Sequence, residues 1–121
     1  MKSVPFNTLL NETLTSIHDL VEGCDVVTFV TKSGKTFQMY HERDCCEYVE
    51  IEEIHGDVED LIGSPILLAE EVEGEVTTDE YGNDQKWTFY KLSTIKGSVT
   101  IRWLGTSNGY YSVEVDFFQI K

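Results

Sequence analysis

The alternation of apolar and polar residues between turn signals most constrains how this chain folds. From Asp25 onward, segments rich in β-branched and aromatic residues are separated by short runs of turn-forming residues. Asp25–Thr31 and Thr36–His41 flank Lys32-Ser33-Gly34-Lys35, in which Ser-Gly forms a two-residue turn. This pattern predicts a β-hairpin whose second strand places Phe37, Met39 and His41 on one face.

Strand patterns continue to the end of the chain. The further strands expected are Cys46–Ile54, Ile66–Glu73, Lys86–Thr94, Ser98–Leu104 and Tyr110–Ile120. Their alternation gives each strand one face for the core and one for solvent. Between the second and third of them, residues 74–84 are acidic and rich in turn formers, which predicts a mobile loop.

Two short helical segments are expected beside the strands. Asp57 is suited to cap a helix of barely two turns, which Gly63-Ser64-Pro65 would end. Near the N-terminus the pattern favours one helical turn at Phe6–Leu10 and then a strand, with Asn11 turning the chain in a left-handed conformation. A longer helix of period 3.6, through Leu10, Leu14, Ile17 and Val21, is the alternative.

These elements predict a mainly β fold, that is a β-rich α+β class. A chain of 121 residues is long enough for one core and one domain, over residues 1–121. We therefore expect an antiparallel sheet, or a sandwich or roll, of seven to eight strands with one or two short helices.

The acidic residues are concentrated in one window. Sixteen of the 22 lie between Glu42 and Asp84, where Arg43 is the only basic residue, so the window has a formal charge of −15. Such a surface repels nucleic acid and anionic membranes and attracts cations or a basic protein surface. Its simplest interpretation is a solvated face that keeps a small protein in solution.

Hydrophobicity and cysteine usage indicate the compartment. The longest uncharged apolar stretch, Ile66–Ala69, is far shorter than the about 20 residues of a membrane span, and the N-terminus lacks the apolar run of a secretion signal. Three cysteines, Cys24, Cys45 and Cys46, are an odd number with two adjacent, which is a poor disulfide framework. We expect reduced thiols and a location in the bacterial cytoplasm.

Several motifs resemble those of a family of small phage- and prophage-encoded proteins of unknown function. The motifs are Asp44-Cys45-Cys46-Glu47-x-Val49, Gly56-Asp57-Val58-Glu59-Asp60-Leu61-Ile62-Gly63-Ser64-Pro65-Ile66, Trp87-Thr88-Phe89-Tyr90, Ile95-Lys96-Gly97-Ser98-Val99-Thr100-Ile101-Arg102-Trp103 and Ser107-Asn108-Gly109-Tyr110-Tyr111-Ser112. They cover most of the chain from Met39 onward. The resemblance implies a phage context; it carries no activity and no functional residues to transfer.

Two groups of residues could hold a metal. The residue types of a zinc site are present in His41, Cys45, Cys46 and His55. Adjacent cysteines on a strand point to opposite faces, which leaves a three-ligand site of His41, one cysteine and His55 as the alternative. The loop around Gly82 offers oxygen ligands for calcium without the twelve-residue calcium pattern. We expect no cofactor, and structural roles for these residues.

Two other functions, cysteine catalysis and nucleic-acid binding, have weaker support in the sequence. Cys45 or Cys46 beside His41 has the residue types of a cysteine nucleophile, but the surrounding acids disfavour a thiolate. Aromatic residues with basic neighbours, such as Trp87 and Lys91, could stack on single-stranded nucleic acid, which the acidic window opposes. The simpler expectation is that the aromatic residues belong to the core: Trp87, Phe89, Trp103 and Phe117. We therefore expect neither an enzyme nor direct nucleic-acid binding.

The acidic window and the phage resemblance together suggest a binding function. We hypothesise a counter-defence inhibitor of the anti-CRISPR type, a DNA mimic that binds the basic surface of a host enzyme that handles nucleic acid. The proposed partner-binding carboxylates are Glu42, Asp44, Glu50, Glu52, Asp57, Glu59, Asp60, Glu70, Glu71, Glu73 and Glu75. The alternatives are a phage structural or assembly protein that self-associates, and a calcium- or zinc-binding domain.

Overall fold

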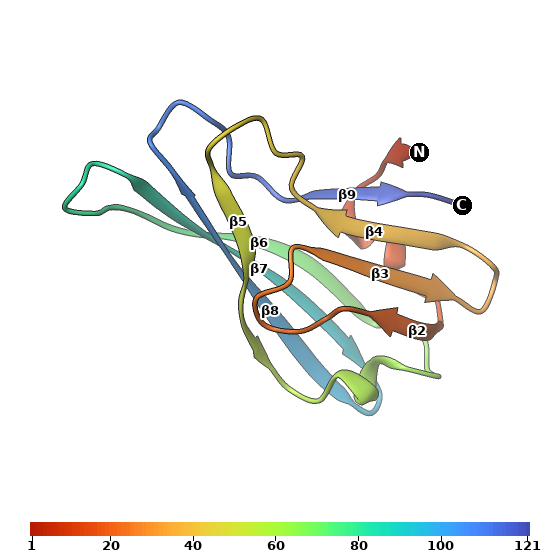
Figure 1. The fold of residues 1–121 in the computed structure, drawn as a ribbon. Helices are drawn as coiled ribbons and strands as arrows, with labels where there is room; N and C mark the ends of the chain where they lie inside the picture. The colour runs from red at the N-terminus through yellow and green to blue at the C-terminus, as the bar shows by residue number, and fades with distance from the viewer.

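The computed structural model describes residues 1–121 and shows two antiparallel β-sheets packed as a sandwich (Figure 1). The five-stranded sheet has the order β1 (Lys2–Ser3), β9 (Asp116–Gln119), β4 (Thr36–Tyr40), β3 (Val26–Thr31) and β2 (Leu14–His18). The four-stranded sheet has the order β5 (Tyr48–His55), β8 (Gly97–Ser107), β7 (Asp84–Thr94) and β6 (Leu68–Thr78). The expected fold class is confirmed.

Eight of the nine strands lie on segments where the sequence predicts strands, and the two-residue β1 is the additional one. The hairpin β3–β4 forms as expected, with Phe29 directly opposite Phe37. Asn11 has a φ of 68°, the left-handed conformation expected for the turn before β2. Local turn chemistry therefore determines the first half of the five-stranded sheet.

Both helical segments are single turns of 3-10 helix. They are η1 (Phe6–Leu9) and η2 (Val58–Leu61). The carboxylate of Asp57 accepts a hydrogen bond from the backbone N–H of Glu59 (3.0 Å), so Asp57 is the predicted N-cap of η2. The chain contains no helix long and apolar enough to cross a membrane.

The core lies between the two sheets. Phe29, Phe37 and Phe117 of the five-stranded sheet face Tyr90 and Trp103 of the four-stranded sheet. Phe6 of η1 packs edge-on against Tyr90 and Phe117, with ring centroids 4.9 and 5.2 Å apart. Each large side chain removed from water in this way stabilises the fold by about 1.5–3 kcal/mol.

The prediction of a mobile loop over residues 74–84 is wrong. Strand β6 continues to Thr78 and pairs with β7, which leaves only residues 79–83 as the turn (Figure 1). A shift of register between Glu73 and Val76 accommodates Gly74, where a Cβ atom would lie 2.7 Å from the Phe89 ring. The result is a long hairpin whose tip projects away from the five-stranded sheet.

The expected last strand, Tyr110–Ile120, is only partly formed. Residues 108–115 cross from the four-stranded to the five-stranded sheet, and only Asp116–Gln119 pairs as β9. The predicted alternation is nevertheless kept along the crossing, because Tyr111 and Val113 are half-buried whereas Ser112 and Glu114 are exposed. An extended crossing segment buries alternate side chains just as a paired strand does.

Candidate functional site

The eleven predicted carboxylates gather on the four-stranded half of the molecule. Four are on β6, two are on β5, three are on η2 and its cap, and two are on the connection from β4 to β5. None of them is buried. The charge that the sequence concentrates in one window therefore lies on one sheet and its connections.

These carboxylates do not form one flat face. Strands β5 and β6 are the two opposite edges of the four-stranded sheet. Along β6, Glu71 lies opposite the buried Tyr90, on the side of the sheet that faces the core, whereas Glu70 lies opposite the exposed Lys91 on the outer side. The acidic surface therefore wraps around both edges of the sheet.

Few of the eleven have a basic partner. Glu52 Oε1 lies 2.7 Å from Arg102 Nη2, and Glu73 Oε1 lies 3.3 Å from Lys86 Nζ. The remaining nine make no ion pair within the chain: Glu42, Asp44, Glu50, Asp57, Glu59, Asp60, Glu70, Glu71 and Glu75. Most of the negative charge is therefore available to an external partner.

A shallow hollow opens on the outer side of the four-stranded sheet. It is lined by Gly74, Glu75, Trp87, Phe89 and Arg102. The sequence suggests that Trp87 and Phe89 belong to the core, yet both are only half-buried here, and the Trp87 indole N–H donates to Glu52 (3.2 Å). Trp103 and Phe117 are buried, as expected.

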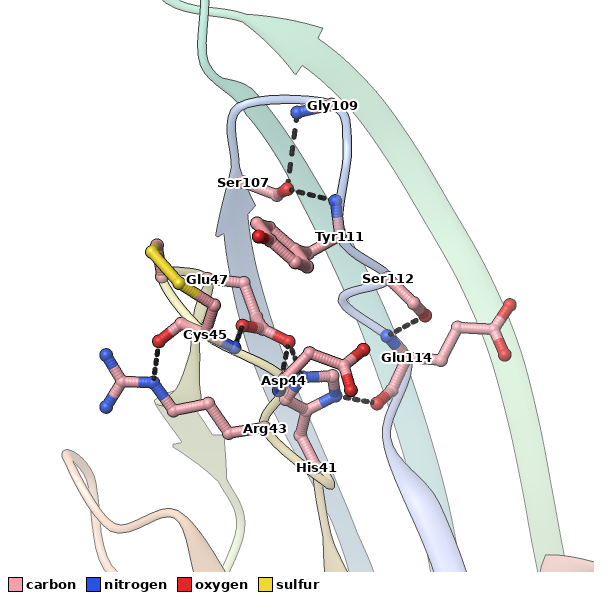
Figure 2. Close-up of polar contacts among 11 residues, drawn as sticks. His41, Arg43, Asp44, Cys45, Glu47, Ser107, Gly109, Tyr111, Ser112 and Glu114 are labelled. Atoms are coloured by element: carbon pink, nitrogen blue, oxygen red, sulfur yellow. Dashed lines mark hydrogen bonds and ion pairs between the residues drawn. A yellow bond between two sulfur atoms is a disulfide. The ribbon is translucent and has the colours of Figure 1, made fainter.

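A polar network at one end of the sandwich centres on Glu47 (Figure 2). Its buried carboxylate accepts hydrogen bonds from the backbone N–H groups of Asp44 and Cys45, both at 2.9 Å, and lies 2.8 Å from His41 Nε2. The N–H of Asp44 is the largest of the influences that lower the pKa of Glu47 from 4.5 to about 2. Glu47 therefore organises the connection from β4 to β5.

The second ring nitrogen of His41 joins this connection to the crossing segment. His41 Nδ1 lies 2.6 Å from the carbonyl oxygen of Glu114, so both ring nitrogens face acceptors (Figure 2). Through these bonds the network holds the connection from β4 to β5 and the crossing segment together.

The expectation of three reduced cysteines is wrong. Cys45 and Cys46 form a disulfide, and Cys24 is the free thiol. We expected Cys46 to begin a strand, on which neighbouring side chains diverge, but β5 begins at Tyr48 and both cysteines lie in an exposed bend before it. In that bend the two cysteine side chains lie on the same side of the backbone, which allows their sulfur atoms to bond.

The structure separates the residues of the predicted zinc group. His41 bonds to Glu47 at one end of β5, and His55 Nε2 lies 2.9 Å from Glu53 Oε1 at the other end. In the loop considered for calcium, Asp79 Oδ1 accepts the backbone N–H groups of Tyr81 and Asn83, both at 2.9 Å, which fixes the turn. No group of three or more His, Cys, Asp or Glu residues is placed to hold a metal ion.

The family model of DUF7448, a domain of unknown function, matches residues 7–117. The chain belongs to the DUF7448 family. The match runs from η1 to the start of β9, so the DUF7448 domain includes both sheets of the sandwich. The chain matches no curated protein and no solved structure.

Sequence reasoning missed two features of this DUF7448 domain. Glu47 was not distinguished from the other acids of the window, although a carboxylate three residues after Asp44, at the start of a strand, is placed to accept backbone N–H groups. The extension of β6 to Thr78 was also missed, although Val76, Thr77 and Thr78 are all β-branched. Glu47 fixes the connection from β4 to β5, and the extension of β6 lengthens the acidic edge of the four-stranded sheet.

Proposed function

We propose that this DUF7448 domain is a non-catalytic binding protein whose acidic surface docks on a basic surface of another protein. One observation carries the proposal: nine of the eleven carboxylates on and around the four-stranded sheet have no basic partner within the chain. An excess of one charge on one half of a small domain attracts the opposite charge and accelerates association with it.

The energetics favour a partner over a merely solvated surface. Two like charges about 10 Å apart in water repel by roughly 0.4 kcal/mol, and salt at physiological strength reduces this to about a third. Over dozens of pairs the repulsion reaches several kcal/mol, a sizeable part of the roughly 5–15 kcal/mol that stabilises a domain. A basic partner would relieve this repulsion.

We further propose the class of partner. Host enzymes that handle nucleic acid have basic channels, in which carboxylates can take the place of phosphates. Together with motifs that resemble those of phage-encoded proteins, this suggests a phage accessory protein that blocks such an enzyme in the host cytoplasm, as a DNA mimic and counter-defence inhibitor of the anti-CRISPR type.

The proposal is tested by capture from bacterial lysate at low and high salt, followed by mass spectrometry. We expect a nucleic-acid-binding protein to be retained at low salt, to be lost at high salt, and to be displaced by added DNA or RNA. If the domain captures only further copies of itself, the result would instead support a phage assembly protein that self-associates. The control is a variant of the domain in which the proposed carboxylates are replaced by amides. If the native domain retains no protein that this variant does not also retain, the proposed function is rejected.

A further inference from the structure

Strand β6 is the free edge of the four-stranded sheet. It is eleven residues long and pairs only with β7. Within Glu70–Thr78 every residue except Gly74 is exposed. Because neighbouring strand residues point to opposite sides, both sides of this part of β6 are accessible, and the hairpin tip at its far end projects beyond the five-stranded sheet (Figure 1).

A long exposed edge presents unpaired backbone N–H and C=O groups, and such an edge accepts a further strand. The other parts of the acidic surface do not combine such an edge with so many carboxylates. Helix η2 has no strand edge, and β5 is connected along its outer edge to residues 23 and 24 through backbone hydrogen bonds of Ile51 with Gly23 (2.8 Å) and Cys24 (2.9 Å). The open edge is therefore that of β6.

The charges of β6 select the kind of strand that can be added. Glu70 and Glu75 lie on the outer side of the sheet, and Glu71 and Glu73 lie on the other side. Pairing with β6 of a second copy would bring four glutamates against four, and like charges on neighbouring strands are destabilising. A strand with lysine or arginine on both of its faces would instead place each cation within reach of a carboxylate.

We propose that an extended basic segment of the partner adds to β6 as a further strand. This inference rests on the proposed function and specifies how the acidic surface docks. Main-chain hydrogen bonds to the β6 edge give the segment its direction, and the four glutamates select for basic side chains. The register shift after Glu73 divides the edge into two short stretches, Leu68–Glu73 and Val76–Thr78.

The carboxylates of β6 differ in the hydrogen bonds and ion pairs that they already make within the chain. Glu71 accepts a hydrogen bond from the Tyr90 hydroxyl (2.7 Å), which orients its carboxylate, and Glu73 is already paired with Lys86. Glu70 and Glu75 have no ion-pair partner. We therefore expect a bound segment to contact Glu70, Glu71 and Glu75 most strongly.

The probe is a ten-residue peptide in which pairs of lysines alternate with pairs of threonines, so that an extended strand has lysine on both faces. Its control is the same peptide with every backbone amide N-methylated. Both peptides carry the same charge, but the second has no backbone N–H group to donate along either of its edges. Binding is followed by titration at low salt and by hydrogen exchange. We expect N-methylation to weaken binding about tenfold and only the parent peptide to protect amides of β6.

Charge variants locate the site. Glu70→Gln, Glu71→Gln, Glu73→Gln and Glu75→Gln together should weaken peptide binding by about tenfold or more. The matched set Asp19→Asn, Glu22→Gln, Asp25→Asn and Glu80→Gln, all exposed and outside the proposed site, should change it less than about threefold.

Three results would overturn the inference. Equal binding of both peptides would show that charge alone attracts the segment, and equal losses in the two variant sets would show that no particular edge is used. Both of these results leave the proposed function standing. Failure of the parent peptide to bind at low salt would also reject strand addition, whereas the proposed function would be judged independently by the lysate capture.

Discussion

At the scale of single residues, Glu47 shows how the same side chain type can serve opposite purposes in one protein. Most carboxylates of the acidic window face solvent, but that of Glu47 is buried and accepts two backbone N–H groups and a bond from His41. A buried carboxylate is stable only when its hydrogen bonds are satisfied in this way. Glu47 therefore stabilises the fold, whereas its neighbours remain available for binding.

The lowered pKa of Glu47 predicts how stability depends on pH. The ionised carboxylate contributes its full stabilisation above its ordinary pKa of 4.5, and this contribution is lost as the pH falls through the folded value of about 2. The melting temperature should therefore fall steeply between about pH 4.5 and 2. Glu47→Gln should melt lower at neutral pH and should lose this part of the pH dependence, whereas Glu50→Gln should retain it. A pH profile of Glu47→Gln that parallels that of the native protein would contradict the assigned role.

The disulfide between neighbouring cysteines predicts a clear result in thiol counting. Without reductant, the unfolded protein should titrate one thiol, that of Cys24, and after reduction it should titrate three. Reduction should leave the melting temperature nearly unchanged, because a bond between adjacent residues closes almost no loop in the unfolded chain. Three titratable thiols without reductant, or a large fall in melting temperature, would reject this account.

At the scale of elements, the sequence predicts best where a local signal is sufficient. Ser33-Gly34 predicts the β3–β4 hairpin, Asp57 predicts the start of η2, and Asn11 predicts the turn before β2, because each depends on the conformation of a few neighbouring residues. The full length of β6 was not predictable in this way. Its far half is exposed on both sides, so the two-residue alternation that indicates a strand is absent there.

Contacts between distant segments escape a sequence pattern altogether. The pairing of His41 with Glu47 depends on a bend at residues 45 and 46, and the bond from His41 to Glu114 depends on how the chain crosses between sheets. The sequence located the acidic residues on one part of the chain, but their arrangement around two sheet edges follows from the strand order β5-β8-β7-β6. Strand order is set by packing of the whole core.

A substitution at Gly74 tests the structure of the long β6–β7 hairpin. A methyl group at this position would lie 2.7 Å from the Phe89 ring and 2.8 Å from the Trp87 carbonyl oxygen. Gly74→Ala should therefore destabilise the domain by about 1–3 kcal/mol in urea unfolding, and hydrogen exchange should accelerate along β6 and β7. Val76→Ala, on the same strand but exposed, is the control and should change stability by less than about 0.5 kcal/mol. An unchanged Gly74→Ala protein would show that β6 and β7 do not pair closely there.

At the scale of the whole molecule, the uneven distribution of charge should make stability depend on salt. Raising sodium chloride from about 10 mM to about 0.5 M shortens the Debye length from about 30 Å to about 4 Å, which removes most of the repulsion among the carboxylates. The melting temperature should therefore rise by several degrees. A melting temperature that is constant or falls with salt would mean that the carboxylates are too far apart to repel one another.

The most direct test of the binding function is the rate at which the captured host partner associates with the domain at increasing salt. We predict that the native protein associates fastest at low salt and slows steeply as salt rises, because charge steering acts mainly on the association rate. The variant with glutamine at positions 70, 71, 73 and 75 should associate at least about tenfold more slowly at low salt and should approach the native rate at high salt. Equal rates for the two proteins at every salt concentration would contradict a binding role for the acidic surface at β6.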